Sequence, residues 1–422
     1  MLTGADLAGI GRTIGLIAAA AVAVPGVVLA YRRQKSLDDS NNLKAEADFL
    51  TTEKNYDDRR DSIVRDRRTR FVSIAEQLAS PALIVRLAGV AAMEALANEW
   101  LGDLDVDEDQ RQREAQACVN VLCSYLRSPY EPPNGTDQPA TLTKKVVKDT
   151  GTGTEEHHEY LLDDMEVRKT IARTLATHLR KITPVPSVRI YSGPWSYMNL
   201  DLAGAYFRNV NFSKCQFLGD INFSGAKFEG SYATFEDAEF SGPARFSEAT
   251  FTSSRVNFKN VRFMQETWFL DTNFHSMFTD FTGIKSRYLT WFMRANFSGE
   301  RIRFFEATFE GRGVLFNLVK FTDCVDVDFM RANFHAETVS MAIMFRRVNF
   351  LQFNNADFLG ETDFSLARFI ETEAHFEGCN LVSAKNLPRG KHLYDAKTVF
   401  PEGMKPPKIW ENMEPKDVPQ DG

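Results

Sequence analysis

Phenylalanine recurs every five to seven residues between Phe207 and Leu381, usually two positions after an alanine or another small or β-branched residue. The steps from Phe228 to Phe251 are seven, five, six and five residues, and the same steps lead on to Phe274. The pattern therefore repeats about every 23 residues, and an internal period of this size is typical of a solenoid. One residue from each period forms a column that we expect to run along this solenoid: Phe207, Phe228, Phe251, Phe274, Phe297, Phe321, Phe345 and Phe369.

A step of about five residues matches neither the period of an amphipathic helix nor the alternation of a flat strand. It matches a chain that turns a corner after each short extended stretch, so that four stretches close one square coil. Side chains two positions apart in an extended chain lie on the same side, so each phenylalanine and the residue two before it should point inward. The pattern predicts four ladders of rings in a narrow interior, each buried ring contributing about 1.5–3 kcal/mol to stability.

The repeat resembles that of the pentapeptide repeat family, whose units run alanine, aspartate or asparagine, then leucine or phenylalanine and two variable residues. The clearest matches are Ala295-Asn296-Phe297-Ser298-Gly299, Ala332-Asn333-Phe334 and Ala356-Asp357-Phe358-Leu359-Gly360. The resemblance covers about 185 residues and implies a right-handed quadrilateral β-helix. Residues added at two of the four corners depart from the plain family pattern and predict extruded corners or bulges.

Two positions break the aromatic rule, because Ser286 and Ser340 stand where phenylalanine is expected. A local irregularity or a register slip explains both, with Tyr288 or Val339 taking the inward place. The alternative is a dent in the wall that receives a partner.

Residues 13–31 carry no charge and consist mostly of Ala, Val, Ile, Leu and Gly. As a helix they would span about 28 Å, close to the thickness of the hydrocarbon core of a bilayer. Arg12 precedes this stretch and Arg32, Arg33 and Lys35 follow it, so the positive-inside rule places the rest of the chain in the cytoplasm. We therefore expect a single-pass membrane protein anchored in the lipid bilayer. A cleaved signal peptide is the alternative, but the basic cluster lies behind the apolar stretch rather than before it.

The fold class expected is α+β and multi-domain. Its five segments are a transmembrane anchor at 1–35, a charged helical stalk at 36–70, a small all-α adaptor domain at 71–185, the β-helix at 190–386 and a Pro-rich cap or tail at 387–422. Both signs of charge are dense in the stalk, which favours a solvated helix or a coiled coil. In the adaptor domain, Val85-Arg86 and Val167-Arg168 each open an apolar helical pattern, similar to HEAT-type helical hairpins. The order of this helical segment also resembles the region that precedes the repeats in membrane-anchored, actinobacterial-type pentapeptide repeat proteins.

Aromatic residues outside the repeat are expected to cover the unpaired strand edges at its two ends. Trp195 precedes the first coil, and Tyr394, Phe400 and Trp410 follow the last one. Between the helices, residues 131–158 contain Pro-Pro-Asn-Gly and Gly-Thr-Gly-Thr and predict a disordered or hairpin insertion.

The sequence brings together none of the titratable clusters that catalysis, a cofactor or a metal requires. Inward positions of the rod are aromatic or small, and outward positions lie on flat or convex faces. The chain has a net charge of −7 and no basic patch, so we expect neither an enzyme nor a nucleic-acid binder. The function expected is a non-enzymatic protein-interaction or scaffolding module on the cytoplasmic face of the membrane. Its protein partner is unknown, and self-association into a homo-oligomer is a further option.

An alternative function follows from the family resemblance, because certain pentapeptide repeat proteins mimic nucleic acid and bind a type II topoisomerase through an acidic rod. Here arginines such as Arg301, Arg303 and Arg346 interrupt any acidic stripe along the rod. The scaffold therefore remains the favoured hypothesis.

Overall fold

The computed structural model describes residues 4–130, 141–147, 155–161, 164–181, 192–389, 392–394, 397–403, 405–408 and 410–412; for residues 4–28, 141–147, 155–161 and 412 it describes the backbone alone. The chain divides into two units, residues 1–70 and residues 71–422. Within the expected insertion, β1 (Thr141–Val147) and β2 (Glu155–Leu161) pair as an antiparallel hairpin.

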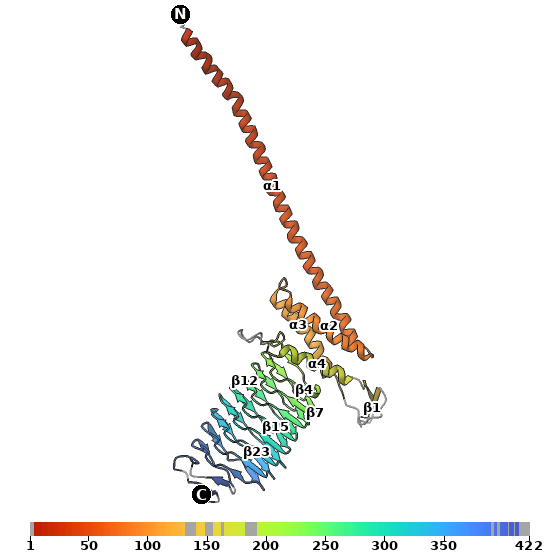
Figure 1. The fold of residues 1–422 in the computed structure, drawn as a ribbon, viewed down its shortest axis with the longest axis vertical. Coiled ribbons are helices and arrows are strands. Elements are labelled where there is room, and N and C mark those ends of the chain that lie inside the picture. Colours follow the sequence, from red (N-terminus) through yellow and green to blue (C-terminus); the bar gives the residue numbers. More distant parts are fainter. Residues whose placement is uncertain are drawn as a thin grey trace, which may run out of the picture. The chain divides into compact units, whose positions relative to one another are not determined.

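The first unit consists of most of one long helix, α1 (Gly4–Leu78), whose last turns belong to the second unit (Figure 1). From residue 29 to residue 63 every side chain is exposed, as in a solvated helix. Among the residues that the structure describes, no helix is both long and apolar enough to cross a membrane. The predicted anchor at 13–31 falls almost wholly outside the residues with described side chains, so the anchor stays a prediction.

The second unit opens with a helical layer built from the end of α1, α2 (Leu83–Gly102), α3 (Glu108–Arg127) and α4 (Asp164–Leu179). Helix α3 starts where the Asp107 carboxylate accepts a hydrogen bond from the Gln110 backbone N–H at 3.2 Å, which satisfies one free donor of the first turn. The core of the layer consists of buried apolar side chains from all four helices: Ile74, Leu78, Val90, Met93, Leu96, Trp100, Val119, Leu122, Leu126, Val167, Ile171 and Leu175.

The two Val-Arg pairs of the sequence have the same structural role. The Arg86 guanidinium, buried at the start of α2, donates to the Ser80 and Pro81 carbonyl oxygens just beyond α1. The Arg168 guanidinium, buried near the start of α4, donates to the Leu126 and Ser128 carbonyl oxygens at the end of α3. Each arginine thus supplies donors to the C-terminal end of the preceding helix, where backbone carbonyls lack partners.

The remainder of the second unit is a solenoid of short parallel strands, seen as stacked arrows in Figure 1. Its first wall consists of β4 (Tyr206–Asn211), β7 (Lys227–Thr234), β10 (Thr250–Phe251), β14 (Asn273–His275), β18 (Asn296–Ser298), β22 (Val319–Thr322), β26 (Ile343–Arg346) and β29 (Arg368–Ile370). Its second wall, which β4 and β7 enter around the corner, consists of β11 (Arg255–Asn257), β15 (Phe278–Asp280), β19 (Arg301–Arg303), β23 (Asp326–Asp328), β27 (Phe350–Gln352), β30 (Ala374–His375), β32 (His392–Tyr394) and β33 (Glu411–Asn412).

Two further sheets close the square. The third wall consists of β5 (Gln216–Phe217), β8 (Glu239–Phe240), β12 (Arg262–Phe263), β16 (Lys285–Ser286), β20 (Thr308–Phe309) and β24 (Asn333–Phe334). The fourth wall consists of β3 (Leu200–Asp201), β6 (Ile221–Asn222), β9 (Ala244–Arg245), β13 (Thr267–Trp268), β17 (Leu289–Trp291), β21 (Gly313–Leu315), β25 (Thr338–Ser340), β28 (Glu361–Asp363) and β31 (Ala384–Lys385). The predicted β-solenoid is therefore confirmed.

The interior is filled by columns of stacked rings. In the first wall, ring centroids of successive coils lie 4.4 Å apart for Phe228 and Phe251 and 5.2 Å apart for Phe345 and Phe369. Rings of neighbouring walls meet edge to face, as Phe251 and Phe258 do at an interplanar angle of 74°. Stacked and edge-to-face contacts are the arrangements that aromatic pairs prefer, so this geometry adds to the gain from burial.

The two serines that break the rule differ from each other. Ser286 pairs in register with Phe263 and Phe309, so it replaces a ring in the third wall and marks no slip. Its buried hydroxyl lies 2.5 Å from the Thr290 hydroxyl, and Tyr288 does not take its place. Ser340, by contrast, is half-exposed, and the buried Met341 stands in the ring column of the fourth wall.

Both ends of the solenoid are covered. At the first coil, the buried Trp195 stacks on His178 of α4 and its indole N–H donates to the Asn98 side chain of α2 at 3.0 Å. At the last coil, the buried Trp410 stacks on Phe376 with a centroid distance of 5.0 Å. Trp410 thus covers the last coil, and Trp195 covers the part of the first coil that lies against α2, where open strand edges could pair with another chain.

Candidate functional site

The column of phenylalanines predicted from the sequence lies together along the first wall, in stacked contact from Phe207 to Phe369. These side chains are buried except for the half-exposed Phe369, so they support the rod and offer nothing to a ligand. Of the predicted membrane-flanking residues, Arg32, Arg33 and Lys35 are exposed on α1, whereas the Arg12 side chain lies outside the described residues.

Reactive groups do not converge in the described part of the chain. No three His, Cys, Asp or Glu side chains with described positions are grouped as a metal site would need. All five cysteines are buried. Burial raises the pKa of the Cys118, Cys123, Cys215 and Cys324 thiols to about 12, so these thiols remain protonated and poorly nucleophilic.

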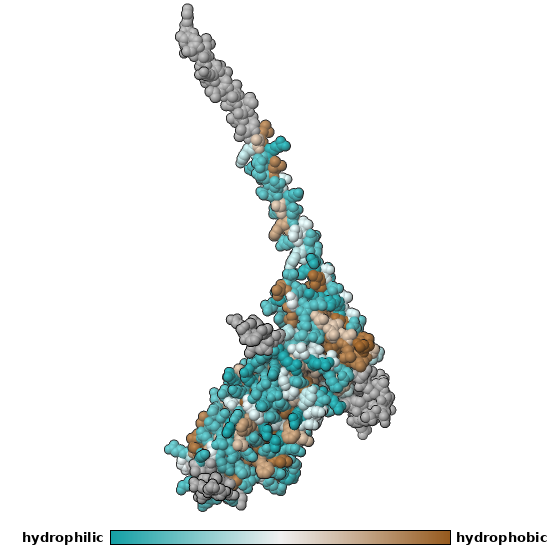
Figure 2. All heavy atoms as spheres, in the orientation of Figure 1, coloured by the Kyte–Doolittle hydropathy of each residue, from teal (hydrophilic) through white to brown (hydrophobic). Residues whose placement is uncertain are grey.

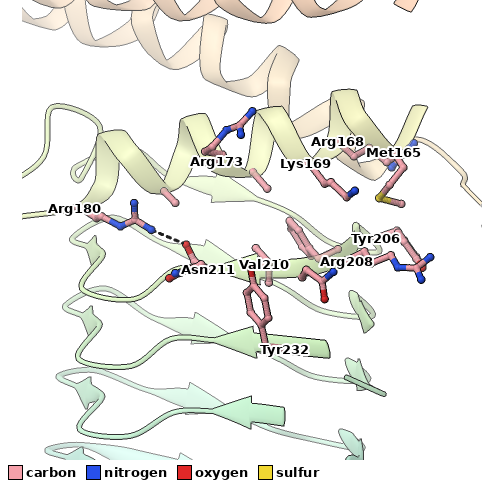
Figure 3. A pocket seen from close by; sticks show the side chains of 14 residues that line it. Met165, Arg168, Lys169, Arg173, Arg180, Tyr206, Arg208, Val210, Asn211 and Tyr232 are labelled. Atoms are coloured by element: carbon pink, nitrogen blue, oxygen red, sulfur yellow. Dashed lines mark hydrogen bonds between the residues drawn. The ribbon is translucent and has the colours of Figure 1, made fainter. Parts of the chain in front are cut away.

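A cleft of about 430 Å³ lies between α4 and β4, where the helical layer meets the first coil (Figure 3). We call it the α4–β4 cleft. Helix α4 lines one side with residues spaced three or four apart: Met165, Arg168, Lys169, Ala172, Arg173, Ala176 and, just beyond the helix, Arg180. Strand β4 lines the other side with all six of its residues, and Tyr232 of β7 lies below it. The helical spacing puts these α4 residues on one face.

Cations predominate around this cleft. Arg180 donates to the Asn211 and Ser213 carbonyl oxygens at 3.0 and 3.2 Å, both of them neutral groups. Lys169 extends toward β4, whereas the exposed Arg173 and Arg208 lie at the rim with their head groups directed outward (Figure 3). Among the described residues, no carboxylate lies within ion-pair distance of Arg173, Arg180 or Arg208.

The acidic groups near the α4–β4 cleft are engaged elsewhere. Asp164 binds the buried Arg168 at 2.6 Å, and Glu166 binds Lys169 at 2.7 Å on the surface. Glu229 accepts a hydrogen bond from the Tyr206 hydroxyl at 2.5 Å, and burial together with this bond raises the pKa of Tyr206. The cleft therefore presents positive charge over a floor that contains Ala172, Ala176 and Val210.

A second cleft of about 560 Å³ follows one corner of the solenoid and is also lined mainly by cations: Lys181, Lys214, Arg262 and Lys285, together with Asp237, Asn260 and Gly283. Here two of the four cations are paired, because Glu239 binds both Lys181 and Arg262. Burial works to raise the pKa of Glu239, but these two partners outweigh it and hold the pKa below its ordinary value. We call this the corner cleft.

Sequence reasoning missed the α4–β4 cleft and expected no basic patch at all. Its cations come from α4 and from β4, two elements separated by a segment without repeats. These cations therefore form no cluster along the sequence. The one signal in the sequence is the spacing of Lys169, Arg173 and Arg180, which fall on one side of a predicted helix.

Comparison with known proteins identifies the solenoid. The family model described as pentapeptide repeats (9 copies) matches residues 202–250 and 235–285. No curated protein and no solved structure matches the chain. Beyond residue 285 the same ring columns continue without interruption of the parallel pairing, as Phe297, Phe321 and Phe345 show. Residues 202–285 therefore carry pentapeptide repeats, and the coils beyond them continue the same β-solenoid.

Proposed function

We propose that this protein is a non-enzymatic protein-interaction module that presents a rigid solenoid to a protein partner at the inner face of a membrane. The observation that carries the proposal is the α4–β4 cleft, a concave, cation-lined surface beside the flat walls of the solenoid. Flat walls favour contact with another folded chain, and a concave charged site gives such contact its orientation.

The interior of the solenoid supports this role because it is occupied by rings and small side chains over its whole length. A body packed in this way has little freedom to close around a small substrate. Its outer walls carry mostly hydrophilic side chains with scattered apolar ones on the face seen in Figure 2. Such mixed surfaces are typical of non-obligate protein interfaces.

Support for the membrane tether comes from the sequence. The uncharged residues 13–31 have the length of a bilayer-spanning helix, and Arg32, Arg33 and Lys35 follow them directly. A tether of this kind would hold the solenoid near a membrane-associated partner.

The alternative, a nucleic-acid mimic that binds a type II topoisomerase, has less support. Such a mimic needs strongly acidic outer faces. Here outward aspartates pair with arginines of neighbouring coils, as Asp271 does with Arg294 and Asp323 with Arg347, and these pairs cancel the acidic potential.

Proximity labelling from the full chain in its host cells tests the interaction role. The variant Arg173→Glu/Arg208→Glu reverses charge at the rim of the α4–β4 cleft, and Lys320→Glu/Arg368→Glu makes the same charge change at exposed sites of the first wall. We expect a dominant labelled protein that is lost in the first variant and retained in the second. Equal labelling by both variants would refute the role of the cleft, and dominant topoisomerase subunits would favour the mimic.

Fractionation of the same cells tests the tether. We expect the full chain to remain with membranes after a high-salt wash and a chain lacking residues 1–35 to be released. Release of the full chain by salt would show that residues 13–31 do not anchor it.

A further inference from the structure

We infer that the α4–β4 cleft binds an acidic peptide segment that also carries aliphatic side chains. This inference rests on the proposed protein-interaction function and names the chemistry of the partner. It follows from three properties of the cleft: unbalanced positive charge, a small apolar floor and free main-chain groups on one strand.

Part of the charge of the α4–β4 cleft is available to a ligand, unlike that of Lys181 and Arg262 in the corner cleft. In the corner cleft, Lys181 and Arg262 share the Glu239 carboxylate. In the α4–β4 cleft, and counting only partners in the part of the chain that the structure describes, Arg180 binds backbone carbonyls alone and Arg173 donates only to the Thr170 hydroxyl at 3.3 Å. The exposed Arg173 and Arg208 side chains point outward at the rim, so they would have to rotate toward a ligand carboxylate, and they need not give up an existing ion pair to do so.

The floor of the α4–β4 cleft favours aliphatic groups. Ala172 and Ala176 present only methyl groups from α4, and the buried Val210 faces them from β4. Each methylene group that a ligand buries on this floor contributes about 0.8 kcal/mol. A volume of about 430 Å³ holds a few side chains, which suits a short segment and not a folded domain.

The edge of β4 offers hydrogen bonds to the backbone of such a segment. The Lys227 N–H donates to the Ala205 carbonyl oxygen, and β4 pairs with β7 through the register Phe207 to Phe228. In a parallel ladder, alternate residues bond to the same neighbour, so the backbone groups of Tyr206 and Arg208 point away from β7. Figure 3 shows that α4 and the cleft lie on that side of β4. Free strand-edge groups are what an extended peptide binds.

Other anions fit less well. A nucleic acid or an anionic membrane needs a wide basic surface, whereas this chain has a net charge of −7 and the α4–β4 cleft is a confined site. The apolar floor would not increase the affinity of the cleft for a bare phosphate. A peptide uses all three properties at once.

Selection from a phage-displayed library of random dodecapeptides tests the inference, with the full chain held in phosphatidylcholine nanodiscs as the target. We expect the selected peptides to be enriched in Asp and Glu next to Leu, Ile or Val. Synthetic copies should bind Arg173→Gln/Arg208→Gln about tenfold more weakly than the unaltered chain, because two charge-assisted contacts are lost. The matched control Lys320→Gln/Arg368→Gln should bind the peptides as the unaltered chain does.

Three outcomes would overturn the inference: selected peptides without acidic enrichment, equal affinity for the cleft variant and the unaltered chain, or displacement of the peptides by a 20-nucleotide single-stranded DNA or phosphatidylserine vesicles at lower concentration. If the in-cell partner is still lost in Arg173→Glu/Arg208→Glu while the library shows no acidic enrichment, the interaction role stands and only the ligand class is wrong.

Discussion

At the scale of single residues, the solenoid depends on two inward positions per wall, the ring and the residue two before it. Phe281 and Thr279 show the arrangement, since both are buried while the neighbouring Phe278 remains partly exposed. The exception at Ser286 is compatible with burial because its hydroxyl finds the Thr290 hydroxyl. A buried polar group with a partner costs far less than one without.

Replacing an inward ring should therefore lower the stability of the fold much more than replacing an outward ring of the same wall. We expect Phe281→Ala to lower the free energy of unfolding by about 3–5 kcal/mol, the usual cost of deleting a buried phenylalanine. The matched change Phe278→Ala removes a ring that lies against Arg255 on the surface, and should cost less than about 1.5 kcal/mol. Urea unfolding followed by circular dichroism measures both values, and similar losses would contradict the inward assignment of Phe281.

At the scale of elements, many turns between walls place a residue with positive φ two positions after a ring. Some of these residues are glycine, such as Gly299, but others are charged, such as Arg294 and Arg331. The charged ones pair with their equivalents one coil earlier: Arg294 binds Asp271, and Arg331 binds Glu306 at 3.2 Å. These pairs offset part of the backbone cost of the left-handed conformation, which is about 1–2 kcal/mol.

Gly299 should tolerate substitution least among these turns. Its φ is +145°, and a Cβ atom there would stand 1.8 Å from the Ser276 carbonyl oxygen of the previous coil. We expect Gly299→Ala to cost more than about 3 kcal/mol, because steric overlap adds to backbone strain. Gly204 also has positive φ but has open space around it, so Gly204→Ala should cost only about 1 kcal/mol. Thermal unfolding of the two variants compares these effects, and equal melting temperatures would disprove the steric argument.

At the scale of the whole second unit, stability depends on sealing both ends of the solenoid. The helical layer seals the first coil through contacts such as Gln116 with the Asn199 carbonyl oxygen at 2.8 Å. The last coil is sealed by a cap in which the buried His392 lies against Phe369, Phe376 and Trp410. The His392 Nδ1 accepts a hydrogen bond from the Ala374 N–H at 3.3 Å, which requires an unprotonated nitrogen.

The cap should therefore weaken in acid. Burial lowers the pKa of His392 from 6.5 to about 4 in the folded chain. The folded state excludes the proton, so the contribution of neutral His392 is complete above pH 6.5 and is lost as pH falls through about 4. We expect a loss that approaches about 3 kcal/mol across this window. Urea unfolding at several pH values, followed by Trp410 fluorescence, measures it.

The matched variant His392→Gln keeps a hydrogen-bond acceptor and cannot gain a proton. The difference in stability between the unaltered chain and this variant should change with pH between 6.5 and 4. His375 acts with the opposite sign, since a hydrogen bond to Glu377 raises its pKa and its contribution is lost as pH rises. Because His375 is present in both chains, it cancels from the difference. A difference independent of pH would show that His392 does not titrate in this window.

Sequence alone determined the repeat and most inward positions, because in a solenoid the residues that touch are separated by a nearly constant 23 positions. The contact of Phe274 with Phe251 and Phe297 can be read from that spacing directly. The sequence did not predict the one-residue offset that puts Met341, rather than Ser340, in the ring column, since small shifts within a coil leave the overall period unchanged. The α4–β4 cleft could be found only from the tertiary structure. Packing of α4 on the first coil brings Arg173 and Arg208 to the same cleft, and the sequence between them has no repeat from which this proximity could be predicted.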